Sequence, residues 1–503
     1  MLFNSYAFIV MFLPVVLAGW FALGRWGSHR SAQLWLIAAS FFYYGWWNPY
    51  YLILLVSSMG FNYLCGQRIA LRLSRNQVPG LLLPIGITVN LLALCYFKYA
   101  HFLLYNLNTI AGTSWTLHAI ILPLAISFFT FQQIAYLVDI AKGKTRREDF
   151  CSYALFVCFF PQLIAGPIVH HSEMMPQFAK STVTRINWTN LAVGITLFSM
   201  GLAKKVLLAD PLSGRVGMYF GAAEADIAMP TAGAWYGVMA FALQIYFDFS
   251  GYTDMALGLA KMFNITLPQN FNSPYQANNI IQFWRRWHMT LSRFLRDYLY
   301  IPLGGNRHGK IRRNLNLMIT MFLGGLWHGA SWTFIIWGLL HGFYLMANHV
   351  WLEFKKRLPW IDCLPEWLRV AVARSLTLLA VLIAWVFFRA ESFPAAINLF
   401  VALFVDTSQA GLFGDGSPTP PKPERWLWLL VLWGFALFVP NTQDILSRYK
   451  PALEVQDPSN HPGLFNGRLL WQPSLLWAAF IAIIFIAAFL SLSNISEFLY
   501  YNF

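Results

Sequence analysis

Long runs of apolar residues, separated by short polar gaps, extend along almost the whole chain. A transmembrane helix needs about 20 apolar residues to cross ~30 Å of hydrocarbon. Convincing runs lie at residues 6–24, 32–47, 50–66, 80–97, 118–140, 188–208, 231–249, 332–350, 371–388, 426–440 and 474–492, and weaker ones at 150–166, 314–327 and 392–405. This pattern predicts an all-α polytopic membrane protein with about 11–13 transmembrane or re-entrant helices.

The composition supports a single membrane-embedded unit. Of the 503 residues, 58% are hydrophobic and only 11% are charged. Soluble domains typically carry about 25% charged residues, so too little polar surface is available for a separate soluble domain. We therefore expect one integral membrane domain over residues 1–503.

The positive charge is arranged as a topology signal. The formal net charge is +14, which on its own would also suit a nucleic-acid-binding protein. The basic residues, however, lie in particular gaps between apolar runs: Arg25, Arg30, Arg68, Arg72, Arg75, Lys142, Lys144, Arg146, Arg147, the group from Arg285 to Arg313, and Lys355 to Arg357. The positive-inside rule places these gaps in the cytoplasm and the N-terminus outside. We expect no nucleic acid as a partner.

Two segments depart from simple spans. In 150–166, Pro161 lies within the run and Gly166 ends it just before Pro167, which predicts a broken, re-entrant segment. The hydrophilic gap 251–313 contains aromatic and basic residues at helical spacing from Phe283 to Tyr298. That spacing predicts an amphipathic helix at the cytoplasmic interface, and an ordinary interfacial helix would give the same pattern.

Among the histidines, His328 is the most informative. It lies between glycines in Gly324-Gly325-Leu326-Trp327-His328-Gly329, and the chain from Asn314 to Trp327 climbs only ~21 Å at 1.5 Å per residue. His328 is therefore expected inside the bilayer, where an ionisable group is functional by default. A helix-packing histidine is the alternative.

The other candidates are less decisive. His288, at the end of Phe283-Trp284-Arg285-Arg286-Trp287-His288, suits either an interfacial anchor or a catalytic partner. His341 is interpreted as structural. Asp248 and Asp254 do not share a helix face, so we expect them to bond a loop at the membrane boundary. The histidines lack close metal-ligand spacing, and no metal site is expected.

Three motifs carry a family resemblance. Residues 283–291, residues 297–306 and Gly324 to Gly329 resemble, in order and spacing, the membrane-bound O-acyltransferase family and its bacterial alginate O-acetyltransferase-like branch. The resemblance covers nearly the whole chain, most strongly about 120–345, and is less distinctive over 370–503. It implies helices around a central reaction channel. It also implies that His328 is catalytic and that His288 is the second functional histidine.

The resemblance implies an inner-membrane O-acetyltransferase with no permanently bound cofactor. The acyl group would pass from a cytoplasmic thioester, acetyl-CoA by analogy, toward an envelope polysaccharide (alginate, cellulose or peptidoglycan) or a partner acetyltransferase. Guanidinium groups bind phosphate well, so the donor-binding candidates are Arg285, Arg286, Arg293 and Arg296. His328 would act as a base or carry the acyl group.

Three alternatives remain open from the sequence. A polysaccharide or acyl-group transporter or flippase would have a similar composition, but it more often shows inverted repeats or paired broken helices, which are not evident here. A non-catalytic scaffold of a secretion complex would leave His328 without a purpose. Within the family, D-alanyl transfer to teichoic acid is the competing reaction.

Overall fold

The computed structural model describes residues 1–145, 149–359, 363–407, 418–453, 469–493 and 499, and over these residues the fold is built from helices. The N-terminal half contains η1 (Ala7–Phe12), α1 (Leu13–Trp26), α2 (His29–Gly45), α3 (Pro49–Ser74), α4 (Leu82–Leu94), η2 (Cys95–Tyr99), α5 (Ala100–Ala111), α6 (Ile126–Ala141), α7 (Phe150–Cys158), α8 (Phe160–Leu163), α9 (His171–Phe178), η3 (Ser181–Thr184), α10 (Trp188–Ala203), η4 (Lys204–Ala209) and α11 (Asp210–Glu224). The prediction of an all-α fold is confirmed.

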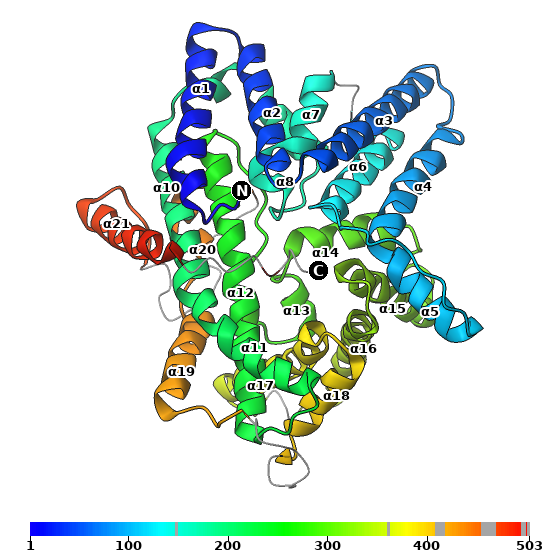
Figure 1. The fold of residues 1–503 in the computed structure, drawn as a ribbon, viewed down its shortest axis with the longest axis vertical. Helices are drawn as coiled ribbons and strands as arrows, with labels where there is room; N and C mark the ends of the chain where they lie inside the picture. The colour runs from blue at the N-terminus through cyan, green and yellow to red at the C-terminus, as the bar shows by residue number, and fades with distance from the viewer. Residues whose placement is uncertain (146–148, 360–362, 408–417, 454–468, 494–498, 500–503) are drawn as a thin grey trace.

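The rest of the described chain begins with the longest helix, α12, and continues with shorter helical elements. They are α12 (Thr231–Met262), η5 (Pro274–Gln276), α13 (Ile280–Trp284), α14 (Met289–Leu295), η6 (Arg296–Tyr300), α15 (Gly309–His328), α16 (Trp332–Lys355), α17 (Glu366–Arg389), α18 (Phe393–Ala402), α19 (Pro423–Phe438), α20 (Thr442–Ile445), η9 (Ser447–Tyr449), α21 (Leu475–Leu490) and η11 (Ser491–Ser493). In Figure 1, α12 runs near the middle of the view and α15 packs beside α16.

Four helical stretches in the described part of the chain are long and apolar enough to cross a membrane. They are Ala7–Trp26, Leu82–Ala111, Trp188–Glu224 and Glu366–Arg389. Shorter apolar helices lie at Ile126–Ala141, Phe393–Ala402 and Leu475–Leu490. The chain is therefore a multi-pass membrane protein. The helical stretch Leu82–Ala111 also continues well beyond the predicted run 80–97.

Close glycine contacts join α10 to α12. A Cβ on Gly201 would lie 2.5 Å from the carbonyl oxygen of Gly251, and one on Gly258 would lie 2.5 Å from the carbonyl oxygen of Gly194. Small residues let two helix backbones approach when lipid supplies no hydrophobic driving force between them. This packing fixes α10 along α12.

Buried ion pairs link α12 to η4, the segment that directly follows α10. Lys204 Nζ lies 2.7 Å from Asp254 Oδ2, and Lys205 Nζ lies 2.5 Å from Asp248 Oδ1. The expected bonds to distant segments are present, since Asp254 also accepts from Thr442 and Gln443 and Asp248 accepts from the backbone N–H of Leu499. Both aspartates, however, lie within α12 and also pair with lysines of η4. The hydrophilic gap was also expected to begin at residue 251, whereas α12 continues to Met262. Charged residues extend this helix because the partner lysines pair with them inside the protein.

Side-chain contacts join some of the predicted basic gaps to one another. Arg30 Nη1 lies 2.6 Å from Asp149 Oδ1, which joins the start of α2 to the chain after residue 147. The hydroxyl of Tyr298 donates to Asp139 Oδ2 at 2.7 Å, which brings η6 to the end of α6. These contacts agree with a shared location for these gaps. Which side of the membrane they face stays a prediction.

The break expected in 150–166 is present. Helix α7 ends at Cys158, Phe159 has φ −51° and ψ 107°, and the short α8 follows with Pro161 in its first turn. Proline cannot continue a helix in its interior. Residues of α8 are buried, as expected for irregular backbone at membrane depth.

Candidate functional site

The pairing of α15 with α16 positions His328. A Cβ on Gly325 would collide with the carbonyl oxygen of Phe334 and would lie 3.1 Å from Gly338 Cα. A Cβ on Gly338 would in turn collide with the carbonyl oxygen of Met321. The glycines therefore let the two backbones touch, and α15 ends at His328 against the first turns of α16.

His328 lies in an aromatic enclosure. Only 3% of the His328 surface is exposed. The imidazole centroid lies 4.9 Å from the ring of Trp327, 5.0 Å from that of Trp337 and 5.2 Å from that of Phe388. The side chain is therefore buried within the protein, and its depth in the bilayer stays a prediction. Because water is excluded, polar interactions with a reacting group would be stronger here than in solvent.

A distant lysine caps the end of the helix that carries His328. Lys98 Nζ donates to the carbonyl oxygen of Trp327 at 2.5 Å and to that of His328 at 3.1 Å. The Tyr99 hydroxyl donates to the carbonyl oxygen of Leu326 at 2.8 Å. The last carbonyls of a helix lack intrahelical partners and carry negative partial charge, so a cation is favourable there. The sequence suggested no such role for Lys98.

The segment around His288 is not the continuous amphipathic helix that the sequence predicted. Helix α13 ends at Trp284, His288 adopts a left-handed conformation with φ 42° and ψ 53°, and α14 begins at Met289. The turn is held by backbone hydrogen bonds from Asn272 N–H to the Arg286 carbonyl and from Met289 N–H to the Asn270 carbonyl, both 2.9 Å. Tertiary pairing with residues 270–272 thus overrides the helical spacing of the sequence.

This turn buries His288 completely. The imidazole packs at 4.9 Å from the ring of Phe249 and at 6.2 Å from that of Trp327. Trp327 therefore contacts His328 on one side and His288 on another. An interfacial anchor would face the membrane surface, whereas the structure places His288 beside the enclosure of His328.

The hydrogen bonds of Asn270 define the tautomer of His288. Asn270 Oδ1 accepts from the backbone N–H of Thr290 at 3.3 Å and from its hydroxyl at 2.8 Å, so this atom is the oxygen of the amide. His288 Nδ1 lies 3.1 Å from the same atom and must donate to it. Burial holds the pKa of His288 below its ordinary value. The neutral ring then has its lone pair on Nε2.

A third histidine joins the group. His341, on α16, is fully buried, and its ring lies 4.9 Å from that of Trp337, which also contacts His328. The indole N–H of Trp284 donates to His341 Nδ1 at 3.3 Å. The sequence interpretation of His341 as structural missed this proximity, because the connection runs through Trp284 and Trp337.

The four candidate donor-binding arginines are not equivalent. Arg285 and Arg296 are exposed, and Arg296 Nε lies 2.7 Å from Asp297 Oδ1. Arg286 is partly buried, with Nη1 3.5 Å from the carbonyl oxygen of Asn272. Arg293 makes two hydrogen bonds to the Glu173 carboxylate, at 2.6 and 3.0 Å. Their role in donor binding stays a prediction, and Glu173 already neutralises much of the charge of Arg293.

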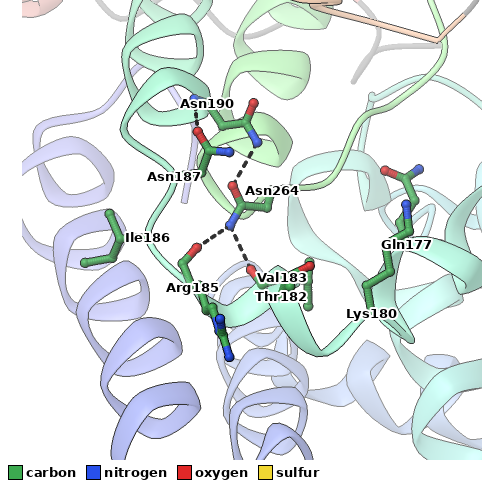
Figure 2. Close-up of a pocket in the computed structure, with 9 residues that line it drawn as sticks. All are labelled: Gln177, Lys180, Thr182, Val183, Arg185, Ile186, Asn187, Asn190 and Asn264. Atoms are coloured by element: carbon green, nitrogen blue, oxygen red, sulfur yellow. Dashed lines mark hydrogen bonds between the residues drawn. The ribbon is translucent and has the colours of Figure 1, made fainter.

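A polar cavity of about 310 Å³ lies near α9 and the start of α10 (Figure 2). Lys180 and Arg185 line it, but none of the predicted site residues does. Asn264 donates to the carbonyl oxygens of Val183 and Arg185 and accepts from Asn190, so its amide is satisfied internally. This cavity is separate from the histidine enclosure. Within the described residues, no group of three or more His, Cys, Asp or Glu side chains is arranged to hold a metal ion.

The fold and site define an integral membrane protein with histidines buried in an aromatic enclosure. Residues 80–361 match the membrane-bound O-acyltransferase family. The chain is 45% identical over 430 residues to the peptidoglycan O-acetyltransferase of Helicobacter pylori, covering 79% of each chain. It is 40% identical over 410 residues to the probable alginate O-acetylase AlgI of Pseudomonas aeruginosa, covering 80% of this chain and 75% of that protein. A third relative, the probable alginate O-acetylase AlgI of Pseudomonas putida, is 36% identical over the full length of both chains.

The chain belongs to the membrane-bound O-acyltransferase family, within its alginate O-acetyltransferase-like branch. It is an acyltransferase. The resemblance drawn from the three sequence motifs is thereby confirmed.

Proposed function

We propose that this protein is an O-acetyltransferase of the bacterial inner membrane that transfers an acetyl group from cytoplasmic acetyl-CoA toward an exported or envelope polysaccharide. The acceptor hydroxyl belongs to the polysaccharide itself or to a partner acetyltransferase that faces the periplasm. The similar proteins named above act, by their names, on alginate and peptidoglycan. Those names favour acetyl over D-alanyl transfer.

The observation that carries the proposal is the placement of His328. It is buried at the end of α15, with His288 reached through the shared neighbour Trp327. Acyl transfer to a hydroxyl needs a base near the acceptor oxygen and a way to stabilise the developing negative charge. An imidazole held in an enclosure closed to bulk water suits the first task, because competing hydrolysis of the thioester is suppressed.

Within this proposal the two histidines have different tasks. His328 contacts the reacting atoms and accepts the proton of the acceptor hydroxyl. His288, whose Nδ1 is engaged by Asn270 and whose Nε2 carries the lone pair, receives or relays that proton. An acyl-histidine intermediate at His328 is the competing mechanism. Trapping labelled acetyl on the protein before an acceptor is added separates the two.

Donor recruitment is assigned to the basic segment that contains α13 and α14. The exposed Arg285 and the partly buried Arg286 lie immediately before the turn that buries His288. An electropositive surface there raises the local concentration of an anionic donor. The acetyl group would enter the enclosure through a channel from this face, while the coenzyme stays on the cytoplasmic side.

A substitution at His328 tests the proposed function. In cells that make an acetylated polymer through this protein, His328→Ala should abolish polymer acetylation while the protein remains at a normal level in the membrane. His118→Ala, at an exposed position, is the matched control and should keep full acetylation. Normal acetylation by His328→Ala would overturn the proposal. Export of the polymer itself should be unaffected, whereas a flippase would lose it.

A further inference from the structure

The tautomer of His341 is determined by its one indole partner. The N–H of an indole can only donate, so His341 Nδ1, which accepts from Trp284 Nε1 at 3.3 Å, carries no proton. The neutral ring therefore has its proton on Nε2. This is the opposite of His288, whose Nδ1 donates to Asn270.

The Nε2–H of His341 has no hydrogen-bond partner within the part of the chain that the structure describes, although the residue is fully buried. An unmet buried donor is costly, and such groups are uncommon in native proteins. Among the described residues, the indole N–H groups of Trp327 and Trp337 are also buried without a hydrogen-bond partner. Trp20 and Trp433 share that property elsewhere, so an unpartnered indole alone is not informative. What is informative is that several such donors are concentrated around His328.

These donors lie next to the predicted reacting group. The ring of Trp337 lies 5.0 Å from His328 and 4.9 Å from His341, and that of Trp327 lies 4.9 Å from His328. Trp337 therefore contacts the rings of both His328 and His341. The enclosure thus combines an imidazole with available N–H groups, the two components that acyl transfer needs.

We propose that His341 is a catalytic residue, whose Nε2–H donates a hydrogen bond to the carbonyl oxygen of the transferred acyl group. The inference rests on the proposed acyl-transfer function and deepens it. The acceptor oxygen bonds to the acyl carbon while its proton passes to His328, and negative charge develops on the carbonyl oxygen beside His341. When the carbonyl re-forms, the carbon–sulfur bond breaks and the leaving sulfur takes up the proton that His328 accepted and shares with His288. His341 keeps its proton throughout.

Trp284 has the supporting role of a positioning residue. Its hydrogen bond excludes a proton from Nδ1 and so keeps the donor on Nε2 for the acyl oxygen. If His341 had only a structural role, the packing of its aromatic ring would be all that is required of it. Its ring is stacked on Phe283 at 6.1 Å and an interplanar angle of 6°, so a phenylalanine could replace it for that purpose.

Three substitutions at one position separate the donor from the ring. His341→Phe retains the aromatic packing without a donor. His341→Gln places an amide nitrogen near the position of Nε2, whereas His341→Asn places one nearer Nδ1. The variants are purified, their thermal unfolding is compared with the parent protein, and kcat and KM for acetyl-CoA are measured in proteoliposomes with an acceptor polysaccharide.

We expect His341→Phe to lower kcat by about 10²–10³-fold, the usual effect of removing one oxyanion donor, with a nearly unchanged KM. His341→Gln should have a kcat at least about 10-fold above that of His341→Asn. Equal activity of the Gln and Asn variants, or full activity of the Phe variant, would overturn the inference. If His341→Phe does not fold, the Gln and Asn pair alone decides. Loss of activity in His328→Ala together with full activity in His341→Phe refutes only the role of His341, whereas an active His328→Ala refutes the proposed function itself.

Discussion

Lys98 and His328 are 230 positions apart in the chain, yet Lys98 Nζ donates to the carbonyl oxygen of His328 at 3.1 Å. The same ammonium group donates to the carbonyl oxygen of Trp327, the residue whose ring contacts both His328 and His288. The contact ties α15 to the η2 segment at the point where the predicted chemistry occurs. A cation at the negative end of the helix fixes its last turn and hence the direction of the His328 side chain.

Replacing Lys98 should therefore impair catalysis without removing a reacting group. Lys98→Met retains most of the apolar stem but leaves two carbonyl oxygens without their donor. We expect kcat to fall by roughly 10–100-fold, because small misplacements of a catalytic group are costly. Lys98→Arg should restore part of the rate. The pair is compared by single-turnover transfer in proteoliposomes, and equal rates for the Met variant and the parent protein would contradict the role.

Charge reversal at Arg285 should weaken the use of the donor. Arg285→Glu is expected to raise KM for acetyl-CoA by about 10-fold, since an electropositive surface concentrates an anionic ligand. The difference from the parent protein should narrow as salt increases, because screening removes the attraction. Arg185→Glu makes the same charge change beside the separate polar cavity and is the matched control. Equal KM values for Arg285→Glu and Arg185→Glu would contradict a role of Arg285 in donor binding and would leave it only a role in membrane topology.

The buried and exposed ion pairs should differ in their contribution to stability. Asp254 accepts from Lys204, Thr442 and Gln443 and is 2% exposed. Asp254→Ala should lower the free energy of unfolding by roughly 3–5 kcal/mol, because it leaves buried partners uncompensated.

The comparison is Arg30→Ala, which breaks the Arg30–Asp149 pair, where both side chains are 49% exposed. Its cost should be about 0–1 kcal/mol. Both variants are unfolded in the same detergent by heat and denaturant. If Asp254→Ala lowers the free energy of unfolding by less than Arg30→Ala does, burial does not determine how much an ion pair contributes to stability.

The basic gaps should all face the cytoplasm. A cysteine introduced at Lys310, in a background without the exposed Cys95 and Cys363, should be protected from an impermeant thiol reagent in intact cells. A cysteine at the exposed Trp115, in the loop that follows α5, should react. Lys310 pairs with Glu353 at 2.6 Å, so residues 307–313 and 353–357 must lie on the same side. Strong labelling at position 310 in intact cells would contradict the predicted topology.

Hydrophobic spacing predicted the helices well because each span needs a long apolar run whatever it packs against. It failed where distant partners decide the structure. The helical spacing of 283–298 could not indicate the break at His288, since Asn270 and Asn272 hold that turn. The extension of α12 past residue 250 was missed because Asp254 reads as polar until Lys204 is placed beside it.

The candidate site also contains residues that the sequence could indicate and residues that only the fold reveals. His328 could be chosen as a candidate from the sequence, because an ionisable residue between glycines in a predicted membrane segment is conspicuous. The proximity of His341 and the helix cap by Lys98 were not, since both depend on side chains brought together by folding. A buried donor without a partner is visible only when its surroundings are known.

The most direct measurement of the central claim is acetyl transfer by purified protein in sealed proteoliposomes, with labelled acetyl-CoA on one side and the acceptor on the other. The account predicts that His328→Ala binds acetyl-CoA with the affinity of the parent protein but transfers acetyl at least about 10²-fold more slowly, the usual effect of losing a general base. Transfer by His328→Ala at the rate of the parent protein, with matched protein content, would contradict it.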